Sequence, residues 1–322
     1  HIPLQEQLGD RLTRLAGMDR VFFCNSGAEA NEAAIKLARL QGHAKGIDNP
    51  AVVVMENSFH GRTLATLSAT GNRKVQAGFE PLVQGFVRVP YADVEALEKT
   101  AELRHDICAL LVEPVQGEGG VHVPPADYLQ RLREICDRRG WLLMLDEIQT
   151  GMGRTGRFFA HQHSAIQPDV MTLAKALGNG VPIGACLARG AAAELFAPGN
   201  HGSTFGGNPL ACSAALAVLE VMESENVPAQ AAEKGAQLKS LLTQALAGLK
   251  GVVEVRGLGM MLGIELDRPC ADLVGRALEQ GLLINVTADR VIRLLPPLLL
   301  SVEDMQLLSD KLAGLVRDFL AA

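Results

Sequence analysis

The chain has 322 residues, of which 48% are apolar and 20% are charged. This length predicts about two domains, and the apolar content is sufficient for a large core. The 30 basic and 36 acidic side chains give a net charge of −6, and only 4% of the residues are aromatic. A nucleic-acid partner is not expected, because such proteins combine basic surfaces with side chains that stack on bases.

The sequence predicts no membrane span, since no apolar run approaches the roughly 18 residues that cross a bilayer. The longest candidate, residues 294–300, is interrupted by Pro296 and Pro297. Six scattered cysteines without a CxxC pair favour neither a disulfide scaffold nor a zinc ribbon, so a reducing cytoplasm is expected. The chain begins at His1 without a leader-like segment, so its natural N-terminus and any targeting signal are not visible.

Short β-rich apolar runs recur along the first two thirds of the chain. We expect strands at residues 21–24, 51–55, 86–89, 107–112, 141–145, 170–173 and 183–187. Stretches with helical spacing separate many of them, as at residues 30–38 and 129–136. Several strands are apolar throughout, which is typical of a sheet covered by helices on both faces. An α/β fold with a mostly parallel sheet is therefore expected.

The pattern changes after about residue 213. A long helical stretch through Met222 precedes a polar helix, strand pairs within 252–266 and 282–295, and a closing helix from about Val302. We interpret residues 1–213 as a large domain and residues 214–322 as a smaller C-terminal α+β domain.

Active sites of such sheets lie at the carboxyl ends of the strands. The first strand runs into Asn25-Ser26-Gly27-Ala28-Glu29, where Ser26 and Glu29 have the spacing of a capping box. A helix is expected to start here, and its free N–H groups suit a phosphate. A capped helix without a ligand is the alternative.

The strand at 141–145 ends in Asp146-Glu147. A buried strand-end carboxylate requires a metal, a basic side chain or a cofactor cation as its partner. No GxxxxGK[ST] motif is present, so phosphoryl transfer lacks its main support. The GxGxxG match at 151–156 follows its strand too distantly and precedes no helical stripe, which predicts a glycine-rich loop rather than a dinucleotide site.

Lys175 stands between apolar strand residues and a glycine loop. Desolvation lowers the pKa of a lysine and makes its amine nucleophilic, the condition for a Schiff base. A strand-end lysine that reaches solvent is the alternative.

Two arginines, Arg62 and Arg293, suit bidentate binding of carboxylates. The alternative is that they form ion pairs at the surface or at an interface. His161 and His163 form an HxH pair near Asp169 without a well-spaced third ligand, so a polar surface loop is expected there rather than a metal site.

A phosphate-binding helix start, a strand-end aspartate and a strand-end lysine follow one another in this chain. With the segments that surround them, the sequence resembles the class III (ω-) aminotransferases, most closely the N-acetylornithine aminotransferases of arginine biosynthesis. The segments are NSGAEANEAAIKLAR, FHGRT, VEPVQGEGG, LDEIQTGMGRTG, TLAKALGNG, HGSTFGGNPLA, RGLGMMLGIEL and NVTADRVIRLLPPL, between residues 25 and 298. Several tens of residues that precede His1 in the family, and help close the pocket and the dimer, are absent from this sequence.

The resemblance implies a pyridoxal-phosphate-dependent transferase of fold type I. Lys175 would form a Schiff base with pyridoxal 5′-phosphate, and Asp146 would pair with the pyridinium N–H. The other implied cofactor contacts are Ser26, Gly27 and Ala28 at the phosphate, Phe59 and Ile148 on the ring faces, Gln149 at the 3-oxygen, and Thr204 of the partner subunit in a homodimer. The implied substrate contacts are Arg62 and Arg293 at carboxylates, with Glu118 beside Arg293.

By the same resemblance, the δ-amino group of N-acetylornithine passes to 2-oxoglutarate, giving N-acetylglutamate 5-semialdehyde and glutamate, and Lys175 moves the proton. An ion pair of Glu118 with Arg293 would mask the second arginine while a monocarboxylate is bound. Ornithine, succinylornithine, 4-aminobutyrate and modified-lysine aminotransferases remain alternatives within the family. An NAD(P)-dependent oxidoreductase and a non-catalytic relative are alternatives of other classes.

Overall fold

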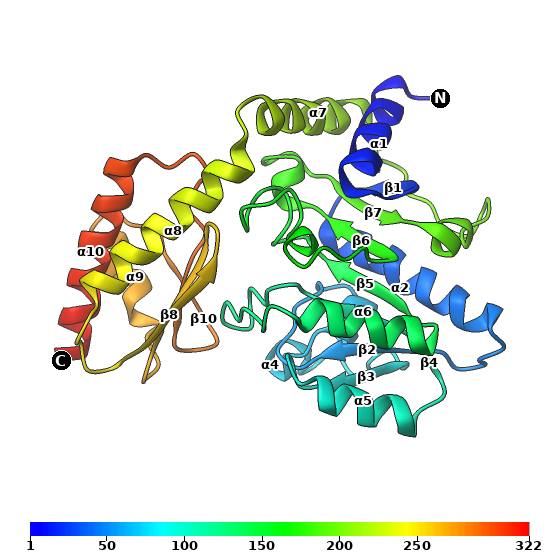
Figure 1. Cartoon of the computed structure of the whole chain (residues 1–322), viewed down its shortest axis with the longest axis horizontal. Helices are drawn as coiled ribbons and strands as arrows, with labels where there is room; N and C mark the ends of the chain where they lie inside the picture. Colours follow the sequence, from blue (N-terminus) through cyan, green and yellow to red (C-terminus); the bar gives the residue numbers. More distant parts are fainter. Residues whose placement is uncertain (322) are drawn as a thin grey trace.

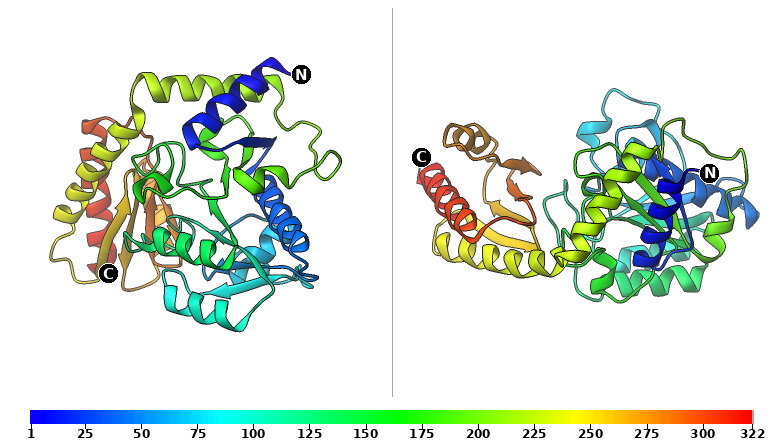
Figure 2. Two further views of the ribbon diagram at one scale, coloured as in Figure 1. Left: turned by 45° about the vertical axis from the view of Figure 1, so that its right-hand side comes forward. Right: turned by 90° about the horizontal axis from the view of Figure 1, so that it is seen from above.

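The computed structural model describes residues 1–321 and contains two β-sheets in separate lobes (Figures 1 and 2). The larger sheet has the strand order β1-β7-β6-β5-β4-β2-β3. Its strands are β1 (Arg20–Cys24), β2 (Ala51–Met55), β3 (Phe86–Val89), β4 (Ile107–Val112), β5 (Leu142–Asp146), β6 (Val170–Leu173) and β7 (Gly184–Ala188).

All seven expected strands of this lobe are present, each within one residue of its expected bounds. Strands β3, β2, β4, β5 and β6 pair in parallel, whereas β7 is antiparallel to both β6 and β1. The expectation of an α/β fold with a mostly parallel sheet is therefore confirmed.

Helices cover both faces of the large sheet, as the continuously apolar strands predicted. Successive strand residues point to opposite faces, so Val52 and Val54 join the core beneath α2 (Gly27–Ala44) while Val53 joins the core on the other face. The helices of that other face are α1 (Pro3–Ala16), α5 (Val94–Leu103), α6 (Tyr128–Arg139) and α7 (Pro209–Ser224). Shorter segments are α3 (Leu64–Ala69), α4 (Arg73–Gln76) and the 3₁₀ helices η1 (Ala160–His163), η2 (Lys175–Leu177) and η3 (Gly190–Glu194).

The smaller lobe is an antiparallel sheet, in the order β10-β11-β9-β8, packed against helices. Its elements are α8 (Val227–Ala245), β8 (Val252–Leu258), β9 (Met261–Leu266), α9 (Asp272–Glu279), β10 (Asn285–Thr287), β11 (Val291–Leu294) and α10 (Val302–Ala321). The expected strand pairs and closing helix are confirmed, and the division into domains 1–213 and 214–322 stays a prediction. Within residues 1–321, no helix has the length and apolar character of a membrane span.

Residues 151–156 form turns and lead into η1 rather than into an α-helix, which confirms the glycine-rich loop. Its Arg154 donates hydrogen bonds from Nη1 to the carbonyl oxygens of Met260 at 2.9 Å and Pro296 at 2.6 Å. This loop therefore ties the large lobe to the small one.

The surface loop expected around His161 and His163 is wrong for His161, whereas His163 is exposed as expected. His161 is buried in η1, where its Nδ1 lies 2.9 Å from Oε1 of the buried Glu147. The nearby Asp169 accepts hydrogen bonds from Arg133 and from the backbone of Leu143. The buried Glu147 carboxylate needs hydrogen-bond donors, which explains why His161 folds inward.

Candidate active site

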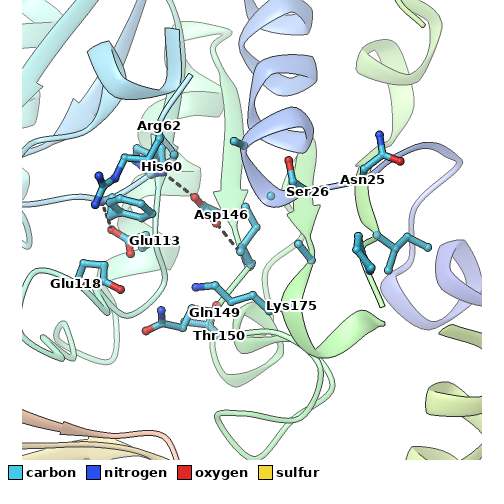
Figure 3. Close-up of a pocket in the computed structure, with 18 of the residues that line it drawn as sticks. Asn25, Ser26, His60, Arg62, Glu113, Glu118, Asp146, Gln149, Thr150 and Lys175 are labelled. Atoms are coloured by element: carbon cyan, nitrogen blue, oxygen red, sulfur yellow. Dashed lines mark hydrogen bonds and ion pairs between the residues drawn. The ribbon is translucent and has the colours of Figure 1, made fainter. Parts of the chain in front are cut away.

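A cavity of about 530 Å³ opens where several strands of the large sheet end (Figure 3). It is lined by residues that follow β1, β2, β4 and β6 and by the end of β5. Those that the sequence singled out are Ser26, Gly27, Ala28, Phe59, Arg62, Glu118, Asp146, Ile148, Gln149 and Lys175. Segments more than a hundred residues apart in the chain thus meet in one pocket.

The start of α2 forms one wall of the cavity. Oγ of Ser26 accepts a hydrogen bond from the Glu29 backbone at 3.2 Å, and the Glu29 carboxylate accepts one from the Asn25 backbone at 2.6 Å. The expected cap is therefore present, with the return bond displaced to Asn25. The first N–H groups of a helix lack intrahelical acceptors, and together with the positive end of its dipole they suit an anion.

The carboxylate of Asp146 lies at the end of β5 and is only 4% exposed. Its Oδ2 accepts from Asn31 Nδ2 at 2.8 Å and contacts His60 Nδ1 at 2.8 Å, while Oδ1 accepts from the Ile148 backbone at 3.1 Å. Figure 3 shows the contact with His60. These donors fix the carboxylate beside the cavity.

Sequence reasoning assigned no role to Asn31 or His60. Asn31 also accepts a hydrogen bond from Thr172 at 2.8 Å, which orients its amide group toward Asp146. Two signals in the sequence could have indicated these roles. Asn31 is a polar residue on the otherwise apolar buried side of α2, and His60 is the histidine of the FHGRT segment.

Lys175 follows β6 in a left-handed backbone conformation, with φ of 48°. Figure 3 shows its amine in the middle of the pocket, with Asp146 on one side and Gln149 on the other. The side chain is accessible from the open cavity, yet protein atoms surround most of it, and this burial lowers the pKa of Lys175. Asp146, Glu118 and Glu113 oppose the shift only in part. A lowered pKa enlarges the neutral, nucleophilic fraction of the amine.

Glu113, just after β4, is a third residue that sequence reasoning missed. Burial, with a smaller contribution from Asp146, raises the pKa of Glu113 to about 7 against the opposing charge of His60. The carboxylate accepts hydrogen bonds from the backbones of Phe59 at 3.1 Å and Gly117 at 3.3 Å. It thereby joins the segment of Phe59 to the loop that carries Glu118.

Arg293 reaches the site from β11 of the small lobe rather than from the cavity wall. Its Nη1 lies 2.8 Å from Oε1 of Glu118 and 3.4 Å from Oε1 of Gln149. The Arg293 side chain is 9% exposed and that of Glu118 is 39% exposed, so the pair faces solvent through the carboxylate. The contact expected between these two residues is present.

The other two expected site residues, Arg62 and Thr204, differ in their position relative to the cavity. Arg62 lines the cavity, with Cζ 5.7 Å from the centre of the Phe59 ring. Thr204 is exposed and is not one of the residues that line the cavity of its own chain.

Comparison with known proteins agrees with this geometry. Residues 2–316 match the family model for class-III aminotransferases. The acetylornithine aminotransferase of Nitrosomonas europaea is 58% identical over 320 residues, which cover 99% of this chain and 81% of the relative. An ornithine aminotransferase structure from Toxoplasma gondii ME49 has a TM-score of 0.93 and 38% identity, over 98% of this chain and 76% of that one. For the acetylornithine aminotransferase structure from Elizabethkingia anophelis the values are 0.85 and 34%, over 98% and 78%.

The chain belongs to the class-III aminotransferases, a family that depends on pyridoxal 5′-phosphate. One Toxoplasma gondii ornithine aminotransferase structure is described as having partial occupancy of this cofactor at its active site. The residues of the cavity fit the group: an amine with a lowered pKa for its aldehyde, a buried carboxylate for its ring nitrogen and a helix start for its phosphate. The protein is a pyridoxal-phosphate-dependent aminotransferase.

The raised pKa of Glu113 predicts a pH-dependent contribution to stability. The folded protein holds a proton on Glu113 between pH 4.5, the ordinary pKa, and about pH 7. Stability therefore falls as the pH rises through this window. Glu113→Gln should reduce the difference in unfolding free energy between pH 5 and pH 8 by about 1–3 kcal/mol, measured by urea denaturation. Glu56→Gln, at an exposed carboxylate nearby, is the control, and an equal effect of both substitutions would contradict the prediction.

Proposed function

We propose that the enzyme transfers the δ-amino group of N-acetylornithine to 2-oxoglutarate and releases N-acetylglutamate 5-semialdehyde and glutamate, a step of arginine biosynthesis. The observation that carries the chemistry is the amine of Lys175 in a cavity beside the buried carboxylate of Asp146. The choice of donor is supported by curated relatives named acetylornithine aminotransferase, from 58% identity to 47% identity over 99% of the chain.

For the cofactor, we assign covalent attachment to Lys175 and the ring-nitrogen contact to Asp146. The phosphate contacts are Ser26, Gly27 and Ala28, the ring faces contact Phe59 and Ile148, and the 3-oxygen contacts Gln149. When bound, the cofactor supplies a protonated ring that withdraws electrons from the carbon bearing the substrate's amino group. The hydrogen bonds from Asn31 and Ile148 keep the Asp146 carboxylate oriented for contact with the ring nitrogen.

Lys175 would have a second role when its amine is free. The amine would accept the proton from Cδ of N-acetylornithine and later give it up, acting first as base and then as acid. A lowered pKa suits this work, because the amine has to be neutral at the start.

Two carboxylate contacts explain how one pocket serves two substrates. Arg62 holds the single carboxylate of N-acetylornithine and one of the two carboxylates of 2-oxoglutarate or glutamate. Arg293 holds the other carboxylate of the dicarboxylate. While N-acetylornithine is bound, the ion pair with Glu118 at 2.8 Å occupies Arg293. When a dicarboxylate binds, its second carboxylate replaces Glu118 as the partner of Arg293.

The expected homodimer, with Thr204 of the partner subunit completing each phosphate site, is part of the proposal. The exposure of Thr204 in its own chain supports this arrangement. A cytoplasmic location is also proposed, supported by six cysteines that are all free and buried in the structure.

The attachment of the cofactor can be located directly. Reduction of the holoenzyme with borohydride should fix the cofactor on Lys175, and peptide mapping should find the added mass there. Lys175→Ala should retain the cofactor noncovalently and lose transamination, because the phosphate contacts and Asp146 remain. A label on another lysine, such as the exposed Lys74, would refute the assignment.

The two arginines should respond differently to loss of the forked guanidinium. Arg293→Lys should slow the half-reaction with glutamate or 2-oxoglutarate more than the half-reaction with N-acetylornithine, whereas Arg62→Lys should slow both. The expected loss is about 1.5–3 kcal/mol for each interrupted contact, because lysine keeps the charge but not the bidentate geometry. Single-turnover absorbance separates the halves, and equal impairment by Arg293→Lys would remove the basis for its separate role.

A further inference from the structure

The loop that carries Glu118 is held from the small lobe by Arg256 of β8. Nε of Arg256 donates to the carbonyl oxygens of Gly120 at 3.1 Å and Val121 at 3.0 Å, and Nη2 donates to Gly120 at 2.7 Å. One guanidinium thus binds two consecutive carbonyl groups that lie two and three residues beyond Glu118. Gly120 presents its carbonyl in a backbone conformation with φ of 119°, which glycine adopts readily.

The guanidinium of Arg256 is itself fixed. The residue is only 8% exposed, and its Nη1 donates to Glu265 of β9 and, at 3.0 Å, to Glu254. The other carboxylate oxygen of Glu265 lies 2.8 Å from Arg290. Because its donors are used on both sides, Arg256 connects the sheet of the small lobe rigidly to the loop of the large lobe.

Two neighbouring contacts hold the same loop. The hydroxyl of Thr287, in β10, donates to the carbonyl oxygen of Glu118 itself. Val121 is fully buried against Met261 and Val115. Loss of Arg256 would leave the carbonyls of Gly120 and Val121 without their donors, and the loop would have to move to recover partners.

We propose that Arg256 is a positioning residue that holds Glu118 against Arg293 and thereby sets the preference between donors with one and two carboxylates. This inference rests on the proposed function of the Glu118–Arg293 pair. When the loop is released, Arg293 loses its masking carboxylate and becomes available to a dicarboxylate at every stage. The preference shifts toward glutamate and away from N-acetylornithine.

The test is the ratio of kcat/KM for glutamate to kcat/KM for N-acetylornithine, from single-turnover half-reactions of the holoenzyme. This ratio does not depend on the folded fraction of a variant, so a loss of stability does not imitate the effect. Glu118→Gln should raise the ratio by about tenfold, and Arg256→Ala should raise it in the same direction by about fivefold or more. Arg290→Ala, which removes another arginine bound to Glu265, is the matched control and should change the ratio by less than about twofold.

The double variant shows whether Arg256 acts through Glu118. In the Glu118→Gln background, Arg256→Ala should change the ratio by less than about twofold, because the carboxylate that it positions is already absent. An unchanged ratio in the single variant, or an equal effect in both backgrounds, would overturn the proposal. If Arg256→Ala does not fold, Arg256→Lys decides, because lysine keeps the charge but cannot bind both carbonyls with a forked group: a shift toward glutamate supports the proposal, and no shift overturns it. A wild-type enzyme that reacts with glutamate but not with N-acetylornithine would overturn the proposed donor instead.

Discussion

The structure depends most on the burial of one carboxylate, that of Asp146. A carboxylate at the end of a buried strand loses its water, and only hydrogen bonds or a positive partner offset that cost. Asn31 of α2, His60 after β2 and the backbone of Ile148 supply contacts from three segments. Each of these segments also lines the cavity. The hydrogen bonds that stabilise the buried Asp146 carboxylate therefore also bring the walls of the pocket together.

The second constraint is that the pocket lies where two lobes meet. Arg293 comes from the antiparallel sheet and Glu118 from a loop of the large lobe, so their ion pair depends on how the lobes are held together. Arg154 of the glycine-rich loop and Arg256 of β8 each donate to backbone carbonyls across this junction. Selectivity between substrates is thereby linked to contacts outside the cavity.

The sequence predicted the features that follow from local pattern. Continuous apolar runs indicated the strands, and Ser26 and Glu29 indicated the start of α2. The position of Lys175 between an apolar strand and a glycine loop indicated a desolvated amine with a lowered pKa. Most roles of individual site residues came from the family resemblance, because spacing alone left a surface ion pair as an alternative for Arg293.

What the sequence did not predict depends on tertiary burial. His161 and Glu147 are polar residues that pair inside the core, and no local pattern distinguishes such a pair from a solvated loop. Glu113 acquires its raised pKa only when surrounding segments exclude water from it. Arg256 has its partners 135 and 136 residues away in the chain, so its contacts become evident only in the folded molecule.

The most direct test of the role of Asp146 is the single-turnover rate of Asp146→Asn holoenzyme with N-acetylornithine, followed by absorbance. Asparagine preserves the shape and removes the charge, so cofactor should be retained while the rate falls by at least about 100-fold, or 3 kcal/mol. A rate equal to that of the wild-type enzyme, in a folded variant with bound cofactor, would contradict the central role of this carboxylate.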